Sequence, residues 1–109
     1  MFNLFKKISL VPLLVAEKKE FVMSKQLLRS GTSVGAMVRE AEHAESKLDF
    51  IHKMAIAQKE INETLYWLEL LYKTQYLHQI EYEKFSIAAT ELLKLLTSII
   101  KSTKSNLRS

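Results

Sequence analysis

The chain has 109 residues, no cysteine, 48% hydrophobic residues and a formal net charge of +4 at pH 7. This length fits one domain with a single buried core. The lack of cysteine excludes a disulfide framework, a thiolate nucleophile and a cysteine-based zinc site, and it favours a reducing, cytoplasmic compartment. Only two glycines and one proline punctuate the chain, which predicts an all-α protein whose helices are joined by short turns.

Residues 1–16 are largely apolar and contain Pro12. A pair of lysines precedes the apolar run, as in an export signal, but Leu14 stands three residues before the end of that run, where a small residue is expected. The run is also far too short to cross a bilayer. We therefore expect a short or divergent first helix that kinks or ends near Pro12, with no contact to a membrane.

The second segment, at about 18–44, has small or apolar residues at the spacing of one helix face. It also contains Gly31 and Gly35. A glycine inside a helix costs about 1 kcal/mol relative to alanine. The pair therefore predicts that a neighbouring helix comes close to the backbone at these two positions.

The third segment, at about 47–74, begins after Ser46, which is followed by Asp49 at the spacing of a helix start. Residues 65–72 are apolar nearly all round the helix, with one acidic exception. A helix that is apolar on every side is normally covered on every side. We expect a second subunit to supply part of that cover, with Trp67 and Tyr72 as packing residues.

The fourth segment, at about 80–101, carries an apolar stripe from Phe85 to Ile99. The short polar joints at 45–46 and 74–78 favour antiparallel neighbours. The predicted architecture is an up-down-up-down four-helix bundle formed by a single domain over residues 1–109, with residues 101–109 as a basic tail.

The positive charge is concentrated at the ends of the chain. Residues 17–93 contain 10 Lys and Arg against 12 Asp and Glu. The excess at the carboxyl end comes from residues that no acidic residue accompanies: Lys94, Lys101, Lys104 and Arg108. Such a cluster is typical of a phosphate contact, and equally of a solvated helix end where cations complement the helix dipole.

Two pairs of side chains have the spacing of metal ligands in di-iron bundles, Glu40 with His43 and Asp49 with His52. Both pairs flank one turn, and the core stripe of the fourth segment offers no matching carboxylate. The hydroxyls beside the glycines have no histidine base at a recognisable spacing. We therefore expect no metal, no cofactor, no catalytic residue and no enzymatic activity.

Other polar side chains are more simply explained by packing. The carboxylates of Glu40, Glu60 and Glu63 are expected to fix the register between helices. Their possible partners are Arg29, Arg39, Lys59 or neighbouring backbone groups, and the sequence does not decide among these. Trp67 and its neighbouring tyrosines could stack on bases, but no Lys or Arg lies between residues 59 and 73. Without interleaved positive charge, a helix interface is the favoured role of these aromatic residues.

Two blocks carry a resemblance to a known family: SKQLLRSGTSVGAMVREAEHAES at 24–46 and DFIHKMAIAQKEINETLYWLELL at 49–71. They resemble the four helix bundle proteins that include the reading frames of intervening sequences in bacterial 23S ribosomal RNA. This resemblance implies the fold but no defined activity. Related accessory proteins of diversity-generating retroelements are pentameric, and the resemblance thus implies a pentamer that handles nucleic acid. One departure is Met37, where many members have Asn.

These observations lead to one functional hypothesis and one alternative. The hypothesis is a non-enzymatic homo-oligomer that contacts RNA or DNA mainly through phosphates, and the alternative is a structural or protein-interaction scaffold that binds no nucleic acid. The candidate nucleic-acid-binding residues are Lys25, Arg29, Arg39, Lys94, Lys101, Lys104 and Arg108. The candidate helix or subunit packing residues are Gly31, Gly35, Trp67 and Tyr72.

Overall fold

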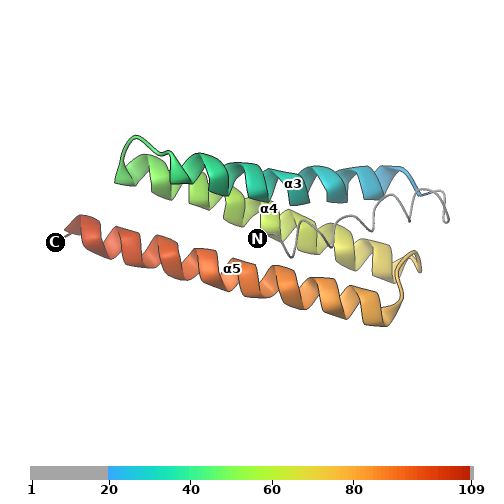
Figure 1. Cartoon of the computed structure of the whole chain (residues 1–109). Coiled ribbons are helices and arrows are strands. Elements are labelled where there is room, and N and C mark those ends of the chain that lie inside the picture. The colour runs from blue at the N-terminus through green and yellow to red at the C-terminus, as the bar shows by residue number, and fades with distance from the viewer. Residues whose placement is uncertain (1–19, 109) are drawn as a thin grey trace.

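The computed structural model describes residues 20–108, which form three α-helices and no strand. With the labels of Figure 1, α3 spans Val22–Glu42, α4 spans Lys47–Lys73 and α5 spans Gln79–Arg108. Consecutive helices run antiparallel (Figure 1). The all-α prediction is confirmed. The described bundle has three helices instead of the predicted four, because the segment expected to form the first helix, 1–16, lies outside the described residues.

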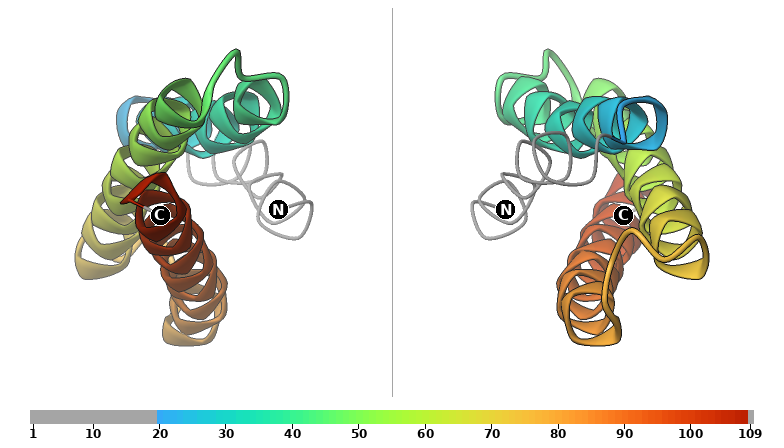
Figure 2. Two further views of the ribbon diagram at one scale, coloured as in Figure 1. Left: turned by 90° about the vertical axis from the view of Figure 1, so that its left-hand side faces the viewer. Right: turned by 90° about the vertical axis from the view of Figure 1, so that its right-hand side faces the viewer.

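The central element of this arrangement is α4, which packs against both other helices. Viewed from either end, α3 and α5 diverge from each other on different sides of α4 (Figure 2). The buried core follows α4 and the faces that α3 and α5 turn towards it. Its hydrophobic members are Leu27, Val34, Ala41, Met54, Ala57, Ile61, Leu68, Leu71, Leu77, Ala89, Leu92, Leu96 and Ile100.

The last helix is longer than its sequence pattern predicts. Residues 101–108, assigned to a basic tail, form the last two turns of α5. No glycine or proline follows Ile100 to end the helix, and cations in a last turn interact favourably with the helix dipole. Helical geometry therefore fixes the relative positions of the carboxyl-terminal cations. None of the described helices is both long and apolar enough to cross a membrane.

The turn between α3 and α4 is built by the two residues that predicted it. Ser46 is the N-cap of α4, and its hydroxyl accepts a hydrogen bond from the backbone N–H of Asp49 at 3.0 Å. In return, the Asp49 carboxylate accepts the backbone N–H of Glu45 at 3.2 Å. Together the two bonds satisfy backbone donors on both sides of the helix start. This confirms that α4 begins after Ser46.

The turn between α4 and α5 relies on a left-handed residue that is not glycine. Gln75 has φ 68°. Its backbone N–H donates to the carbonyl of Tyr72 at 3.0 Å, and the N–H of Tyr76 donates to the carbonyl of Leu71 at 2.9 Å. This is the double hydrogen-bond pattern of a Schellman C-cap, in which the left-handed position usually holds glycine.

We expect the substitution Gln75→Gly to stabilise the protein. A side chain in the left-handed region costs about 1–2 kcal/mol, part of which glycine recovers while adding entropy to the unfolded chain, so a net gain of about 0.5–1 kcal/mol is expected. Urea denaturation followed by circular dichroism measures the change. Gln75→Ala, which keeps a Cβ at this position, is the matched control and should bring no such gain. Equal stability of the Gly and Ala variants would contradict this account of the turn.

The start of α3 is capped by the carboxylate that precedes it. Glu20 is 7% exposed, and its Oε1 accepts the backbone N–H of Ser24 at 2.7 Å. Burial alone would raise the pKa of this carboxyl. Hydrogen bonds from the backbone N–H groups of Ser24, Met23 and Val22 outweigh that effect and bring the pKa below its usual value. The carboxylate replaces the side-chain cap that Phe21, the N-cap residue, does not provide.

We expect Glu20→Gln to lower the free energy of unfolding by about 0.5–2 kcal/mol at neutral pH, the usual cost of losing a helix cap. The native pKa of Glu20 is depressed, so its contribution is present above the unfolded-state pKa and disappears as the pH falls through the native value. The variant and the wild type should therefore converge as the pH falls below the native pKa of Glu20. Urea melts over a series of pH values from neutral to acid test this. If the difference in the free energy of unfolding stayed constant down to acid pH, the loss of stability would come from packing and not from the charge of Glu20.

Candidate nucleic-acid interface

Four of the predicted cations follow one another along a single face of α5. Lys101, Lys104 and Arg108 lie 7, 10 and 14 residues after Lys94, which places all four within about 80° of the helix circumference. The three lysine side chains are exposed. We call Lys94, Lys101, Lys104 and Arg108 the α5 basic stripe. No acidic residue follows Glu91 in the chain, so the part of α5 beyond Lys94 offers this stripe no acidic side chain.

The neighbouring helix leaves the stripe unopposed as well. Thr97, which lies on the same face between Lys94 and Lys101, accepts a hydrogen bond from the Gln58 amide at 2.8 Å. This hydrogen bond places the α5 basic stripe beside α4. Next to Gln58 in the chain, Lys59 is exposed and adds positive charge. The next two acidic residues on α4 are Glu60 and Glu63, and both turn towards α3, where they pair with Arg29.

Arg29 of α3 is held by two carboxylates of α4. Its guanidinium forms an ion pair with Glu60 at 3.5 Å and a second one with Glu63. Of the partners that the sequence left open for these two carboxylates, the structure shows Arg29. The hydrogen bond from Arg29 is the main cause that lowers the pKa of Glu63, and the same bond raises the pKa of Arg29. Trp67 also donates to Glu63, at 3.3 Å. Arg29 therefore joins α3 to α4 and is less free to contact phosphate than an unpaired arginine.

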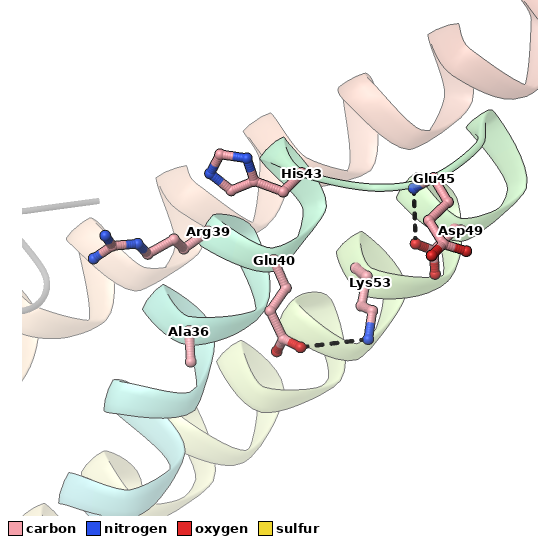
Figure 3. Close-up of a pocket in the computed structure, with 7 residues that line it drawn as sticks. All are labelled: Ala36, Arg39, Glu40, His43, Glu45, Asp49 and Lys53. Atoms are coloured by element: carbon pink, nitrogen blue, oxygen red, sulfur yellow. Dashed lines mark hydrogen bonds and ion pairs between the residues drawn. The ribbon is translucent and has the colours of Figure 1, made fainter.

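Arg39 lines a shallow groove at the α3–α4 turn (Figure 3). Its side chain points away from the ion pair between Glu40 and Lys53, whose atoms are 3.5 Å apart. Lys25, the remaining α3 candidate, is exposed. Because α3 and α5 diverge, the structure does not join the α3 cations to the α5 basic stripe. The groove residues are Ala36, Arg39, Glu40, His43, Glu45, Asp49 and Lys53.

The groove also contains part of the spacing pattern that resembles a di-iron site. In Figure 3 the imidazole of His43 points away from the Glu40 carboxylate. The Asp49 carboxylate is engaged in capping α4, where it accepts the Glu45 N–H. Within residues 20–108, no three His, Cys, Asp or Glu side chains come close enough to hold a metal ion.

The two glycines of α3 occupy different surroundings. Gly31 is buried. At Gly35, a Cβ atom would meet nothing within 4 Å. The predicted close helix contact is therefore absent at Gly35 within the described chain, because the helix face at that position opens onto empty space. Steric overpacking is not expected from a larger side chain there unless another molecule covers the position.

The aromatic residues of α4 are mostly covered by the chain itself. Tyr72 stacks on Tyr82 of α5, with ring centroids 4.4 Å apart and planes 6° apart. Trp67 is half-buried and packs against the core. Tyr66 is 55% exposed, and its ring lies edge-on to Trp67 at 4.9 Å. Of the aromatic residues at 65–72, Tyr66 is thus the one that the described chain leaves uncovered.

One polar contact of the α3–α4 interface was not predicted. The hydroxyl of Thr64 lies 3.0 Å from that of Ser30, and both side chains are fully buried. The two hydroxyls also contact the carbonyls of Leu27 and Glu60 within their own helices. Each hydroxyl thus has a partner despite its burial. The sequence signal was the presence of small hydroxyl residues at core spacing on both helices.

The sequence of residues 1–98 matches the family described as 23S rRNA-intervening sequence protein. The chain belongs to this family. It is also similar to a protein of unknown function from the S23 ribosomal protein family of Bacteroides thetaiotaomicron, whose crystal structure superimposes with a TM-score of 0.87. The two chains are 57% identical, and the match covers 90% of this chain and 91% of the other. No curated protein matches the chain.

Membership of the 23S rRNA-intervening sequence protein family confirms the resemblance carried by the blocks at 24–46 and 49–71. Both blocks fall inside the matched residues. They form α3, the α3–α4 turn and most of α4, so they include the Arg29 ion pairs and the capped turn. Most of the α5 basic stripe follows the matched range, and only Lys94 lies within it.

Proposed function

We propose that this chain is a cytoplasmic, non-enzymatic homo-oligomeric module that binds RNA or DNA through phosphate contacts. The observation that carries the proposal is the α5 basic stripe. Its lysines are exposed, and none of the ion pairs among the described residues involves them. An unopposed row of cations on a rigid helix is the kind of surface that attracts a polyanion.

The family supports the same direction. Its description refers to intervening sequences of 23S rRNA, and the structurally similar Bacteroides protein is assigned to a ribosomal protein family. Neither description states an activity. Among residues 20–108 no zinc-binding cluster is found, and the chain contains no RNA-recognition signature. The proposed contact therefore depends on the charge of the phosphates and not on the identity of the bases.

We expect binding of short labelled RNA or DNA to weaken steeply between about 50 and 200 mM salt, because counterion release dominates such contacts. The variant Lys101→Ala, Lys104→Ala, Arg108→Ala should bind more weakly. Its salt slope should be shallower by about 0.7–0.9 for each phosphate that no longer meets a cation. Fluorescence anisotropy measures both the affinity and the salt slope.

The matched control for this experiment removes three lysines from other surfaces, by Lys53→Ala, Lys73→Ala and Lys84→Ala. It lowers the net charge by the same amount and should leave most of the affinity and the salt slope intact. Circular dichroism checks that both variants are folded. No binding at about 50 mM salt would favour the alternative function, a structural or protein-interaction scaffold.

The proposed homo-oligomer rests on the family resemblance, which implies a pentamer, and on the exposed apolar side chains of the described helices. Tyr66 is the clearest example, since it adjoins the half-buried Trp67. A tyrosine that is more than half exposed in one chain gains burial when a second copy covers it.

We expect the wild type to sediment as a single oligomeric species at micromolar concentration. Tyr66→Asp should shift the protein towards monomer, since it places an unpaired charge in the contact while removing little from the single chain. Sedimentation equilibrium gives the masses, and circular dichroism confirms that the helices persist. A wild type that sediments as a monomer would disprove the assembly.

A further inference from the structure

We infer that the α5 basic stripe selects double-stranded over single-stranded nucleic acid. This inference rests on the proposed function and specifies its partner: a duplex whose paired phosphate backbones meet the stripe. RNA and DNA duplexes share this chemistry. The inference depends on where the described aromatic residues lie, on the rigidity of the stripe and on the charge density of the two kinds of partner.

The first observation is that no stacking platform adjoins the stripe. Proteins that bind single strands combine cations with aromatic side chains on which the bases stack. Among the Phe, Tyr and Trp side chains of residues 20–108, the exposed ones are Phe21 and Tyr66. Phe21 precedes α3, and Tyr66 belongs to the carboxyl-terminal half of α4. Figure 1 shows that α3 begins and α4 ends at one end of the molecule, whereas α5 ends at the other. Because α4 and α5 are antiparallel and Gln58 meets Thr97, Tyr66 lies beyond the Lys94 end of the stripe.

The second observation concerns Trp67, the single tryptophan of the chain. Its indole N–H donates to Glu63, which in turn binds Arg29 of α3. Trp67 therefore lies on the α3 side of α4. Gln58, by contrast, contacts the α5 stripe through Thr97. The tryptophan and the stripe thus belong to different faces, and a strand bound along the stripe would not stack on Trp67.

The third observation is geometric. From Lys94 to Arg108 the stripe spans 14 residues of continuous helix, or about 21 Å. A duplex presents one phosphate charge per about 1.7 Å of its axis, and its backbone is already ordered. A flexible single strand carries about half that density in helical form and must also be ordered, a cost that base stacking normally offsets. With phosphate contacts alone, the duplex is the better partner.

The test compares blunt RNA and DNA duplexes with their separate strands at equal length, by fluorescence anisotropy on the full chain. We expect tighter binding to duplexes. The expected salt slope is about 1.3 times steeper for duplexes, because each phosphate contact contributes about 0.9 against 0.7 for single strands. For about four such contacts, the duplex preference should grow about threefold when salt falls from about 200 to about 50 mM. Comparison of the RNA and DNA duplexes identifies which one is preferred.

Two further readouts place the contact. The variant Lys94→Ala, Lys101→Ala, Lys104→Ala should lose the duplex preference, whereas Lys53→Ala, Lys73→Ala, Lys84→Ala should keep it. Trp67 fluorescence should stay unchanged on binding. Tighter binding to single strands, or quenching of Trp67 by them, would overturn the duplex inference while leaving the proposed function in place. No binding to any of the probes would overturn the proposed function itself.

Discussion

The ion pairs between Arg29 and the carboxylates of Glu60 and Glu63 are the interaction on which the rest of this surface depends. They cross from α3 to α4 beside the buried hydroxyl pair of Ser30 and Thr64. Each hydroxyl also has a carbonyl partner in its own helix, but the two hydroxyls come within hydrogen-bonding distance of each other only in this register of the helices. The ion pairs are more exposed, and their effect is mainly on where charge lies. They orient two α4 carboxylates towards α3 and leave the α5 side of the helix without them.

The charge around the α5 basic stripe differs from the charge that the composition of the chain indicates. Residues 17–93 carry slightly more acidic than basic residues, which on average would argue against a polyanion partner. Several of the described acidic side chains, however, make contacts within the fold: Glu20 and Asp49 cap helices, and Glu63 pairs with Arg29. Among the described side chains, no carboxylate pairs with the lysines of the α5 basic stripe. The local field there is therefore more positive than the net charge of the chain indicates.

Local sequence signals predicted the parts of the structure that local chemistry determines. Ser46 with Asp49 marked the start of α4 because a cap needs only neighbouring residues. Ion pairing of Glu60 and Glu63 was also expected, but the sequence left Arg29, Arg39 and Lys59 as possible partners, and the structure shows that Arg29 is the partner. The position at which α4 ends was predicted, but the C-cap that ends it was not. The left-handed position of such a cap usually holds glycine, and this chain has Gln75 there. The length of α5 was underestimated because its apolar stripe ends near Ile100 while its helix-forming residues continue.

The predictions that failed or remained incomplete concern what covers the helix surfaces, not where the helices lie in the chain. A glycine in a helix can allow close packing within the chain or against another molecule, and sequence spacing does not distinguish these cases. At Gly35 the described chain provides no close neighbour. The apolar stretch 65–72 likewise proved to be covered in part by α5, through the stacking of Tyr72 on Tyr82. By contrast, the α5 basic stripe follows from sequence once the helix is known to continue, because residues 7, 10 and 14 positions after Lys94 must share its face. The spacing of the cations therefore predicts the candidate interface. The structure adds the helix that aligns them and shows that none of the ion pairs among the described residues involves the lysines of the stripe.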